Sequence, residues 1–321
     1  MKLGFKKALS IISAAALLLT SGCSSGASEE ADSEKISVVT TIFPQYDFAR
    51  QIGGDKIELT MLVTPGGESH AYEPTPQDMV KVKNCDVFIC VGGESDVWAN
   101  SILDAIDTKD IQVVSMMDCV QTVEEEHKEG MEEEHEHDEN CDHEEVEYDE
   151  HVWTSPKNAM AISKTIGEAF IAADSANADY YSQSLESYLA ELEALDSDFK
   201  DVVDNAARKT LIFGDRFPFR YFVESYGLDY YAAFPGCSTE TDVSASVMSF
   251  LINKVKDENV PVVYYIEFSA RKIADTICDE TGAEALLFHS CHTVSKEDFE
   301  NGATYVSLMR ENLENLKKGL N

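Results

Sequence analysis

Three loops carry histidines at positions where an imidazole could bind a metal ion. His70 lies in a loop rich in glycine and proline, TPGGESHAYEPTPQD. His151 lies in DEHVWTSP, whose Ser-Pro pair is typical of a helix start. His289 ends the apolar run ALLFH, and His292 follows three residues later. Neutral imidazole is a preferred ligand of zinc and its neighbours, so these loops together predict one divalent transition-metal site.

A separate acidic segment, residues 124–150, holds four of the eight histidines of the chain: His127, His135, His137 and His143. It also contains sixteen carboxylates and one lysine, within a chain whose formal net charge is −35. Blocks of charge are usually solvated and disordered, but histidine-rich tracts also bind metals. We interpret the segment as a low-affinity loop that gathers zinc; the alternative is an inert tether.

Alternating strand and helix patterns predict the elements that position these loops. Eight apolar, mostly β-branched runs predict strands, at residues 36–43, 57–63, 85–92, 112–117, 210–214, 228–234, 261–268 and 284–290. Helical stretches fit between them, so the units repeat as strand then helix. Such repeats indicate parallel sheets, in which loops and ligands meet at the carboxyl ends of the strands.

One long amphipathic segment separates the two groups of strands. Apolar residues recur at three- and four-residue steps within residues 176–208, which predicts a linking helix of roughly 45 Å. We therefore predict an α/β fold with two parallel-sheet lobes. The N-terminal lobe would cover residues 35–175, including the acidic segment, and the C-terminal lobe residues 209–321. The cleft between two such lobes is the expected place for a binding site.

The N-terminus predicts export and a lipid anchor. Three lysines precede thirteen apolar or small residues, a run that is too short to span a bilayer. The sequence LTSGC follows, resembles a bacterial lipobox and ends at Cys23. We expect residues 1–23 to be a lipoprotein signal peptide with Cys23 lipidated, and residues 24–34 to be a flexible tether. The alternative is an ordinary secretory signal with a chance cysteine.

These motifs resemble the metal-binding lipoproteins of ABC importers for zinc and manganese. In the first loop, His70 precedes Tyr-x-Pro-x-Pro-x-Asp, as in the first ligand loop of that family. The sequence around His151 is similar to its His-x-Trp-x-Ser-Pro motif, and residues 240–245 are similar to its Glu-x-Glu-Pro-Ser-Ala stretch. The resemblance runs from about residue 36 to the C-terminus. It implies a metal buried between two lobes that a rigid helix joins.

The chain departs from this family at two ligand positions. Members usually supply a third histidine in His-Asp-Ala-Phe-Gly-Tyr-Phe, where this chain has GDRFPFRYF and Gly214 or Arg216 takes the place of the histidine. Asp215 is the only obvious donor there. The fourth position is commonly an Asp after the last strand, where this chain has His289.

The resemblance thus implies a metal set of His70, His151 and His289, completed by Asp215 or by water. Three imidazoles and one oxygen suit tetrahedral zinc. We expect His292 to be exposed or to stand behind the ligands, so that His289 closes the cleft from the second lobe.

Two cysteines of the second lobe allow two interpretations. Cys237 and Cys291 each follow a predicted strand of the same sheet, so their sulfur atoms could meet near the cleft. We predict a disulfide between them, because an exported protein can form one. The alternative is thiolate ligation of the metal by Cys237 or Cys291.

The resemblance implies an extracytoplasmic, lipid-anchored solute-binding protein that delivers zinc to the ABC permease of a metal importer in a bacterial cell membrane. Zinc-specific members carry a histidine-rich acidic loop at the place of residues 124–150, which favours zinc over manganese. The acidic charge excludes nucleic acid as a partner, and we expect a monomer.

We expect no enzymatic activity, because the sequence has neither an HExxH motif nor a P-loop. The alternatives are a manganese-specific member of the family, a zinc-dependent hydrolase with Glu267 as the base, and a surface adhesin.

Overall fold

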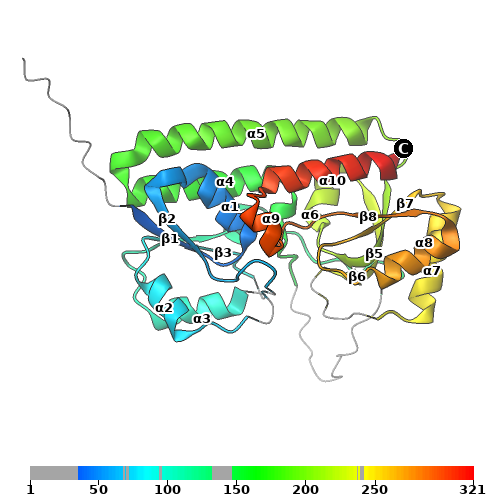
Figure 1. Cartoon of the computed structure of the whole chain (residues 1–321), viewed down its shortest axis with the longest axis horizontal. Helices are drawn as coiled ribbons and strands as arrows, with labels where there is room; N and C mark the ends of the chain where they lie inside the picture. Colours follow the sequence, from blue (N-terminus) through cyan, green and yellow to red (C-terminus); the bar gives the residue numbers. More distant parts are fainter. Residues whose placement is uncertain are drawn as a thin grey trace, which may run out of the picture. The chain divides into compact units, whose positions relative to one another are not determined.

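Two parallel sheets flanked by helices make up the fold, which confirms the predicted α/β class (Figure 1). The computed structural model describes residues 35–67, 69, 72–93, 96–131, 147–236, 238 and 242–321. In that part of the chain, no helix is both long enough and apolar enough to cross a membrane.

The first sheet has the strand order β2-β1-β3-β4, and all its pairs are parallel. Its strands are β1 (Ile36–Thr40), β2 (Ile57–Met61), β3 (Val87–Cys90) and β4 (Gln112–Ser115). Each is shorter than the predicted run, because the apolar residues continue into the loops and into α1 (Phe43–Gly53). Neighbouring residues of β1 face opposite sides of the sheet. Val39 packs in a cluster with residues of α2 (Pro76–Lys83) and α3 (Val97–Ala105). Val38 packs in the largest hydrophobic cluster of the described residues, called the main core below.

The second sheet has the order β6-β5-β7-β8 and is also parallel throughout. Its strands are β5 (Thr210–Phe217), β6 (Asp229–Pro235), β7 (Val262–Tyr265) and β8 (Glu284–Leu287). On one face, Ile212 packs in a cluster with residues of α7 (Ala245–Asp257) and α8 (Lys272–Thr281). On the other face, Phe213 joins the main core with residues of α6 (Arg220–Tyr226) and α10 (Tyr305–Leu320).

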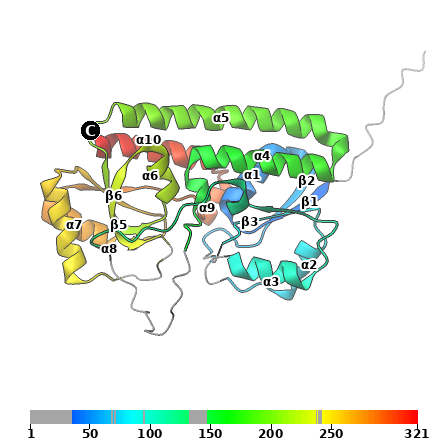
Figure 2. The same ribbon diagram turned by 180° about the vertical axis from the view of Figure 1, so that it is seen from behind.

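A shared layer of helices connects the two lobes. In the region predicted as the linking helix lies α5 (Ala178–Asp204), whose 27 residues give a length of roughly 40 Å. It contacts α1, α4 (Pro156–Ala173), α6 and α10, and it passes along both sheets (Figures 1 and 2). One hydrophobic core runs through both lobes beneath this layer. The lobes are therefore held together by a common core and not by the helix alone.

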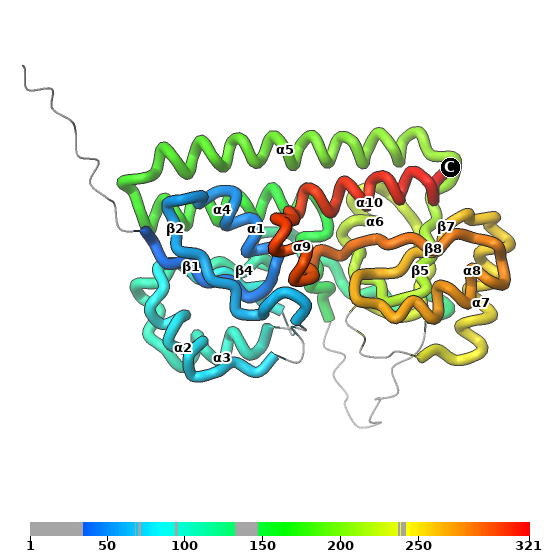
Figure 3. Tube along the Cα trace, in the orientation of Figure 1, coloured from blue at the N-terminus to red at the C-terminus, as the bar shows by residue number. Residues whose placement is uncertain are grey.

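The chain crosses between the lobes again after β8. Figure 3 follows it from β8 through α9 (Lys296–Glu300) into α10. On this path, the main-chain N–H of Tyr305 donates to Asp47 of α1, at 2.7 Å, and Arg50 donates to the carbonyl of Ala303. The loop that carries His289 and His292 is thus anchored in the second lobe at one end and against the first lobe at the other.

The start of α4 lies where the Ser-Pro pair predicted it, at Pro156. Ser155 occupies the position before the helix, but its hydroxyl does not cap the helix. Instead it shares a hydrogen bond of 2.8 Å with the hydroxyl of Ser225 in α6. The segment that follows His151 is therefore attached to the second lobe.

Candidate metal centre

A pocket lies between loops of the two lobes, at the carboxyl ends of the strands. Its walls include Gly66, Gly67 and His151 from the first lobe. From the second lobe, its polar side chains are those of Arg216, Glu267, Ser290, His292 and Thr293. This is the position that the parallel sheets predicted for a binding site.

His151 is buried and is oriented by a carboxylate. It precedes a short 3-10 helix, Val152–Thr154, and its main-chain N–H donates to Asp149 Oδ1 at 2.8 Å. The ring Nδ1 lies 3.2 Å from the same oxygen. In the neutral ring, a carboxylate beside Nδ1 favours the proton on that nitrogen, so that Nε2 can bind a metal, the arrangement common among metal-ligating histidines.

The charge around His151 favours cations. Burial alone would lower the pKa of His151, but the charge and hydrogen bond of Asp149, together with the charges of Glu150 and Glu125, raise the pKa above its ordinary value of 6.5. A divalent cation bound at this ring would experience the same attraction. Protons therefore compete with a metal for His151, and acidification should weaken metal binding.

His292 faces His151 across the pocket. The two ring centroids are 6.0 Å apart, and the His292 ring also lies 5.5 Å from that of Trp153. His292 Nε2 shares a hydrogen bond of 2.6 Å with the hydroxyl of Ser69, on the His70 loop. On the same loop, the N–H of Gly66 donates to Thr293 Oγ1 at 3.1 Å. The loop of His70 therefore meets the loop of His292 at the pocket.

The two second-lobe donors predicted from the sequence, His289 and Asp215, do not line this pocket. His289 is buried, and its Nδ1 accepts a hydrogen bond of 2.9 Å from the N–H of Cys291. Asp215 accepts main-chain hydrogen bonds from Arg216, at 2.9 Å, and from Ile266, at 3.4 Å. Their roles as ligands stay predictions.

Of the two residues that could take the place of the missing histidine, Gly214 and Arg216, only Arg216 lines the pocket. A Cβ at Gly214 would lie 2.6 Å from the main chain of Ala274, so no side chain fits there without a shift of α8. The side chain of Arg216 lines the pocket and donates to the carbonyl of Ser238. Guanidinium stays protonated and cannot bind a metal.

Glu267 is the carboxylate of the pocket. Its two oxygens accept hydrogen bonds from the N–H of Ser290, at 2.8 Å, and from the hydroxyl of Ser290, at 2.5 Å. Its Oε2 also lies 3.6 Å from His289 Nδ1. Glu267 therefore fixes the loop that presents His292, and it is an oxygen donor beside that loop.

Several predicted site residues lie outside the residues that the structure describes, namely Cys23, His70, His135, His137, His143 and Cys237. Among the described residues, no three His, Cys, Asp or Glu side chains are grouped closely enough to hold a metal by themselves. His127 is described and exposed.

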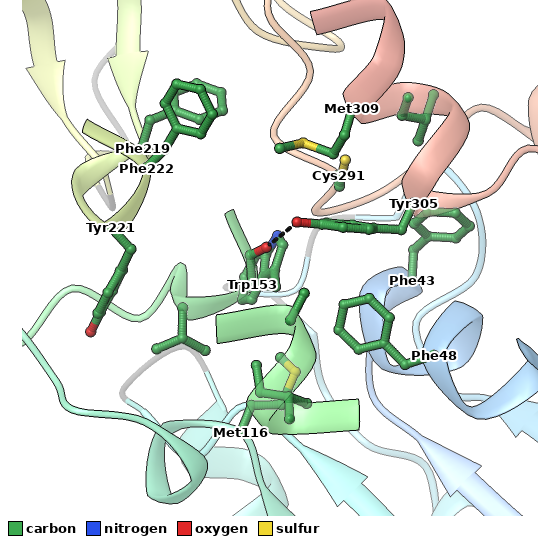
Figure 4. Packing of buried hydrophobic residues seen from close by; sticks show 14 of the residues in the cluster. Phe43, Phe48, Met116, Trp153, Phe219, Tyr221, Phe222, Cys291, Tyr305 and Met309 are labelled. Atoms are coloured by element: carbon green, nitrogen blue, oxygen red, sulfur yellow. Dashed lines mark hydrogen bonds between the residues drawn. The ribbon is translucent and has the colours of Figure 1, made fainter. Parts of the chain in front are cut away.

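The side chain of Cys291 is buried in the hydrophobic core. It packs in the hydrophobic cluster with Trp153, Tyr305 and Met309 (Figure 4). Burial raises the pKa of Cys291 well above its ordinary value, which opposes thiolate ligation. The predicted disulfide with Cys237 stays a prediction, and the packing of Cys291 gives it no support.

Sequence reasoning missed the residues that join the lobes around the site. Trp153 donates its indole N–H to the carbonyl of Ser290, at 2.9 Å. Tyr305 donates its hydroxyl to the carbonyl of Trp153, at 2.8 Å (Figure 4). The motif signal for Trp153 was present, since it lies two residues after His151. Its partners are 137 and 152 residues away, so no local pattern could reveal them.

Comparison with known proteins places this geometry in a family. Residues 38–319 match the family model described as zinc-uptake complex component A, periplasmic. The chain is 32% identical over 323 residues to the high-affinity zinc uptake system protein ZnuA of Bacillus subtilis (strain 168), and the match covers 98% of each chain.

Two further matches concern streptococcal proteins. The zinc-binding lipoprotein AdcA of Streptococcus pneumoniae is 28% identical over 88% of this chain, which spans 56% of that longer protein. The crystal structure of the Zn(II)-bound ZnuA-like domain of AdcA matches 89% of this chain and 99% of its own, at 25% identity and a TM-score of 0.74. From the family match over nearly its whole length, the chain belongs to the zinc-uptake complex component A family of periplasmic binding proteins.

Proposed function

We propose that this chain captures a zinc ion outside the cytoplasm, between its two lobes, and delivers the ion to the membrane permease of an ABC importer. The observation that carries the proposal is the pair of imidazoles, His151 and His292, one from each lobe, with ring centroids 6.0 Å apart. Zinc binds imidazole nitrogen at roughly 2.0–2.1 Å, so two rings on one ion have centres about 5–6 Å apart. The two rings already have this separation.

His70 is the third ligand in this proposal. Two residues that precede it on its loop contact the second lobe, since Gly66 bonds Thr293 and Ser69 bonds His292. A zinc ion at His292 Nε2 would replace the Ser69 hydroxyl as the partner of that nitrogen. Water or a carboxylate oxygen such as that of Glu267 would complete a tetrahedral set. His289 and Asp215 are the second choice for the second-lobe donor.

A site rich in imidazole favours zinc over manganese, because manganese prefers oxygen ligands. The names of the relatives support the same choice, since ZnuA and AdcA are described as zinc-uptake and zinc-binding proteins. We further propose that Cys23 carries a lipid that anchors the protein to the outer face of the cell membrane, and that the protein works as a monomer.

Zinc should raise the melting temperature of the chelator-treated mature protein, and manganese at the same concentration should raise it much less. A ligand that binds only the folded state stabilises it by about 4 kcal/mol when present at about 1,000 times its Kd. Scanning calorimetry at pH 7.5 with each metal measures the effect. A shift with manganese and none with zinc would overturn the zinc assignment, and no shift with either metal would overturn metal capture itself.

A further inference from the structure

We infer that the two ends of the acidic segment form a clamp that holds the second lobe against the loop of His151 and thereby sets the zinc affinity. The clamp consists of residues 123–131 and 147–149 with their contacts to the second lobe. This inference rests on the proposed function, because it concerns the orientation of His151 as a zinc ligand. The inference assigns this role to the two ends of the segment and not to the histidine-rich residues between them.

The two ends pair with each other as a short antiparallel ribbon. Glu124 and Tyr148 form an antiparallel bridge. The N–H of Glu125 donates to the carbonyl of Glu147 at 2.9 Å, and the N–H of Asp149 donates to the carbonyl of Val123 at 3.0 Å. Asp149, which orients the ring of His151, is therefore part of the ribbon.

Tyr221 of α6 attaches both strands of the ribbon to the second lobe. Its hydroxyl donates to the carbonyl of Asp149 at 2.6 Å and accepts from the N–H of Val123 at 3.3 Å. The Tyr221 side chain is buried. One hydroxyl of the second lobe thus fixes the main chain two residues before His151.

The first end of the segment continues along the second lobe beyond the ribbon. Lys128 pairs with Asp229 and lies over the ring of Tyr230, 4.5 Å from its centroid. Gly130 has a φ of +90°, and a Cβ there would lie 2.1 Å from the ring of Phe250. Met131 is buried in the main core. These residues are packed against the protein, although blocks of charge are usually solvated.

The clamp reaches the metal ligand through Gly236. Glu125 Oε1 accepts a hydrogen bond of 3.0 Å from the N–H of Gly236. A Cβ at Gly236 would lie 3.3 Å from His151 Cε1 and 3.4 Å from Asp149 Oδ2, so this glycine packs directly against the His151 ring and its carboxylate partner. Glu125 and Tyr221 are therefore positioning residues: one holds the main chain against the ring, and the other holds the residue that orients it.

The test compares variants of the full chain at pH 8, by competition with a chromophoric chelator for zinc and by the visible absorption of the cobalt-loaded protein. Tyr221→Phe and Glu125→Ala should each weaken zinc about 10-fold or more, as changes behind a metal ligand do, and should alter the cobalt spectrum. Glu125→Gln keeps an acceptor oxygen, so its zinc affinity and cobalt spectrum should be those of the wild type. Deletion of residues 132–146 should keep the tight site and remove only weak extra zinc.

Tyr226→Phe is the matched control for Tyr221→Phe. Tyr226 lies on the same helix and donates its hydroxyl to Asp196 at 2.8 Å, away from the clamp. The Tyr226→Phe substitution should lower the melting temperature of the metal-free protein without any change in zinc affinity or in the cobalt spectrum.

Wild-type affinity and spectrum in both Tyr221→Phe and Glu125→Ala would overturn the clamp, and so would loss of the tight site on deletion of residues 132–146. A wild-type protein that binds no zinc would instead overturn the proposed function.

Discussion

Replacing His151 with alanine should weaken zinc binding by more than about 100-fold. Changes to residues behind a metal ligand cost roughly 10- to 100-fold in affinity, and removal of the ligand itself should cost more. His151 is also the imidazole with the best-defined partner, because Asp149 holds its Nδ1 at 3.2 Å and so presents Nε2 to the pocket. Competition with a chromophoric chelator at pH 8 measures the change.

Two variants control this experiment. Asp149→Asn keeps the shape of the side chain but removes the charge, and should fall between the wild type and His151→Ala. His137→Ala removes a histidine of the acidic segment that is not part of the clamp and should leave the tight site unchanged. Tight zinc binding that survives in His151→Ala would show that the ion is held elsewhere.

His292→Ala should weaken zinc binding at least about 10-fold more than His289→Ala does. The two residues lie three positions apart on one loop, but only His292 lines the pocket and faces His151. His289 instead accepts a main-chain hydrogen bond from Cys291 and is buried. His289→Ala should therefore lower the free energy of unfolding of the metal-free protein by about 1–3 kcal/mol, since it leaves a buried N–H without its partner.

Chemical unfolding of the metal-free variants, beside the zinc competition, separates the two effects. A folded His289→Ala variant that loses zinc while His292→Ala keeps it would restore the order predicted from the sequence, in which His289 closes the cleft.

The fold class could be predicted from the sequence because its signals are local. Apolar, β-branched runs alternate with helical stretches, and each sheet has the parallel order that such repeats require. The resemblance to metal-binding lipoproteins of ABC importers is likewise confirmed by the family match. The relatives are named as uptake and binding proteins, which confirms the expectation that the chain is not an enzyme.

The choice between His289 and His292 could not be made from the sequence. It depends on the turn between them, where Cys291 has a φ of +61°. A left-handed conformation is uncommon for any residue other than glycine. The sequence Ser290-Cys291-His292 therefore does not predict this turn. Glu267, 23 residues upstream, holds this loop through Ser290. The direction of each imidazole is thus decided by contacts between distant residues.

The ends of the acidic segment were also beyond prediction from composition. A block of carboxylates usually remains solvated, and that rule ignores partners elsewhere in the chain. Tyr221 and Asp229, about 100 residues away, bind Val123 and Lys128. Charge content alone therefore could not reveal that the described ends of the segment are packed against the second lobe.

Anomalous diffraction at the zinc edge, from crystals of the zinc-loaded mature protein, tests the central claim most directly. We predict one strong peak between the lobes, roughly 2.0–2.1 Å from a ring nitrogen of His151 and from one of His292. A peak bound by His289 and Asp215 without His292, or no peak between the lobes, would contradict this account.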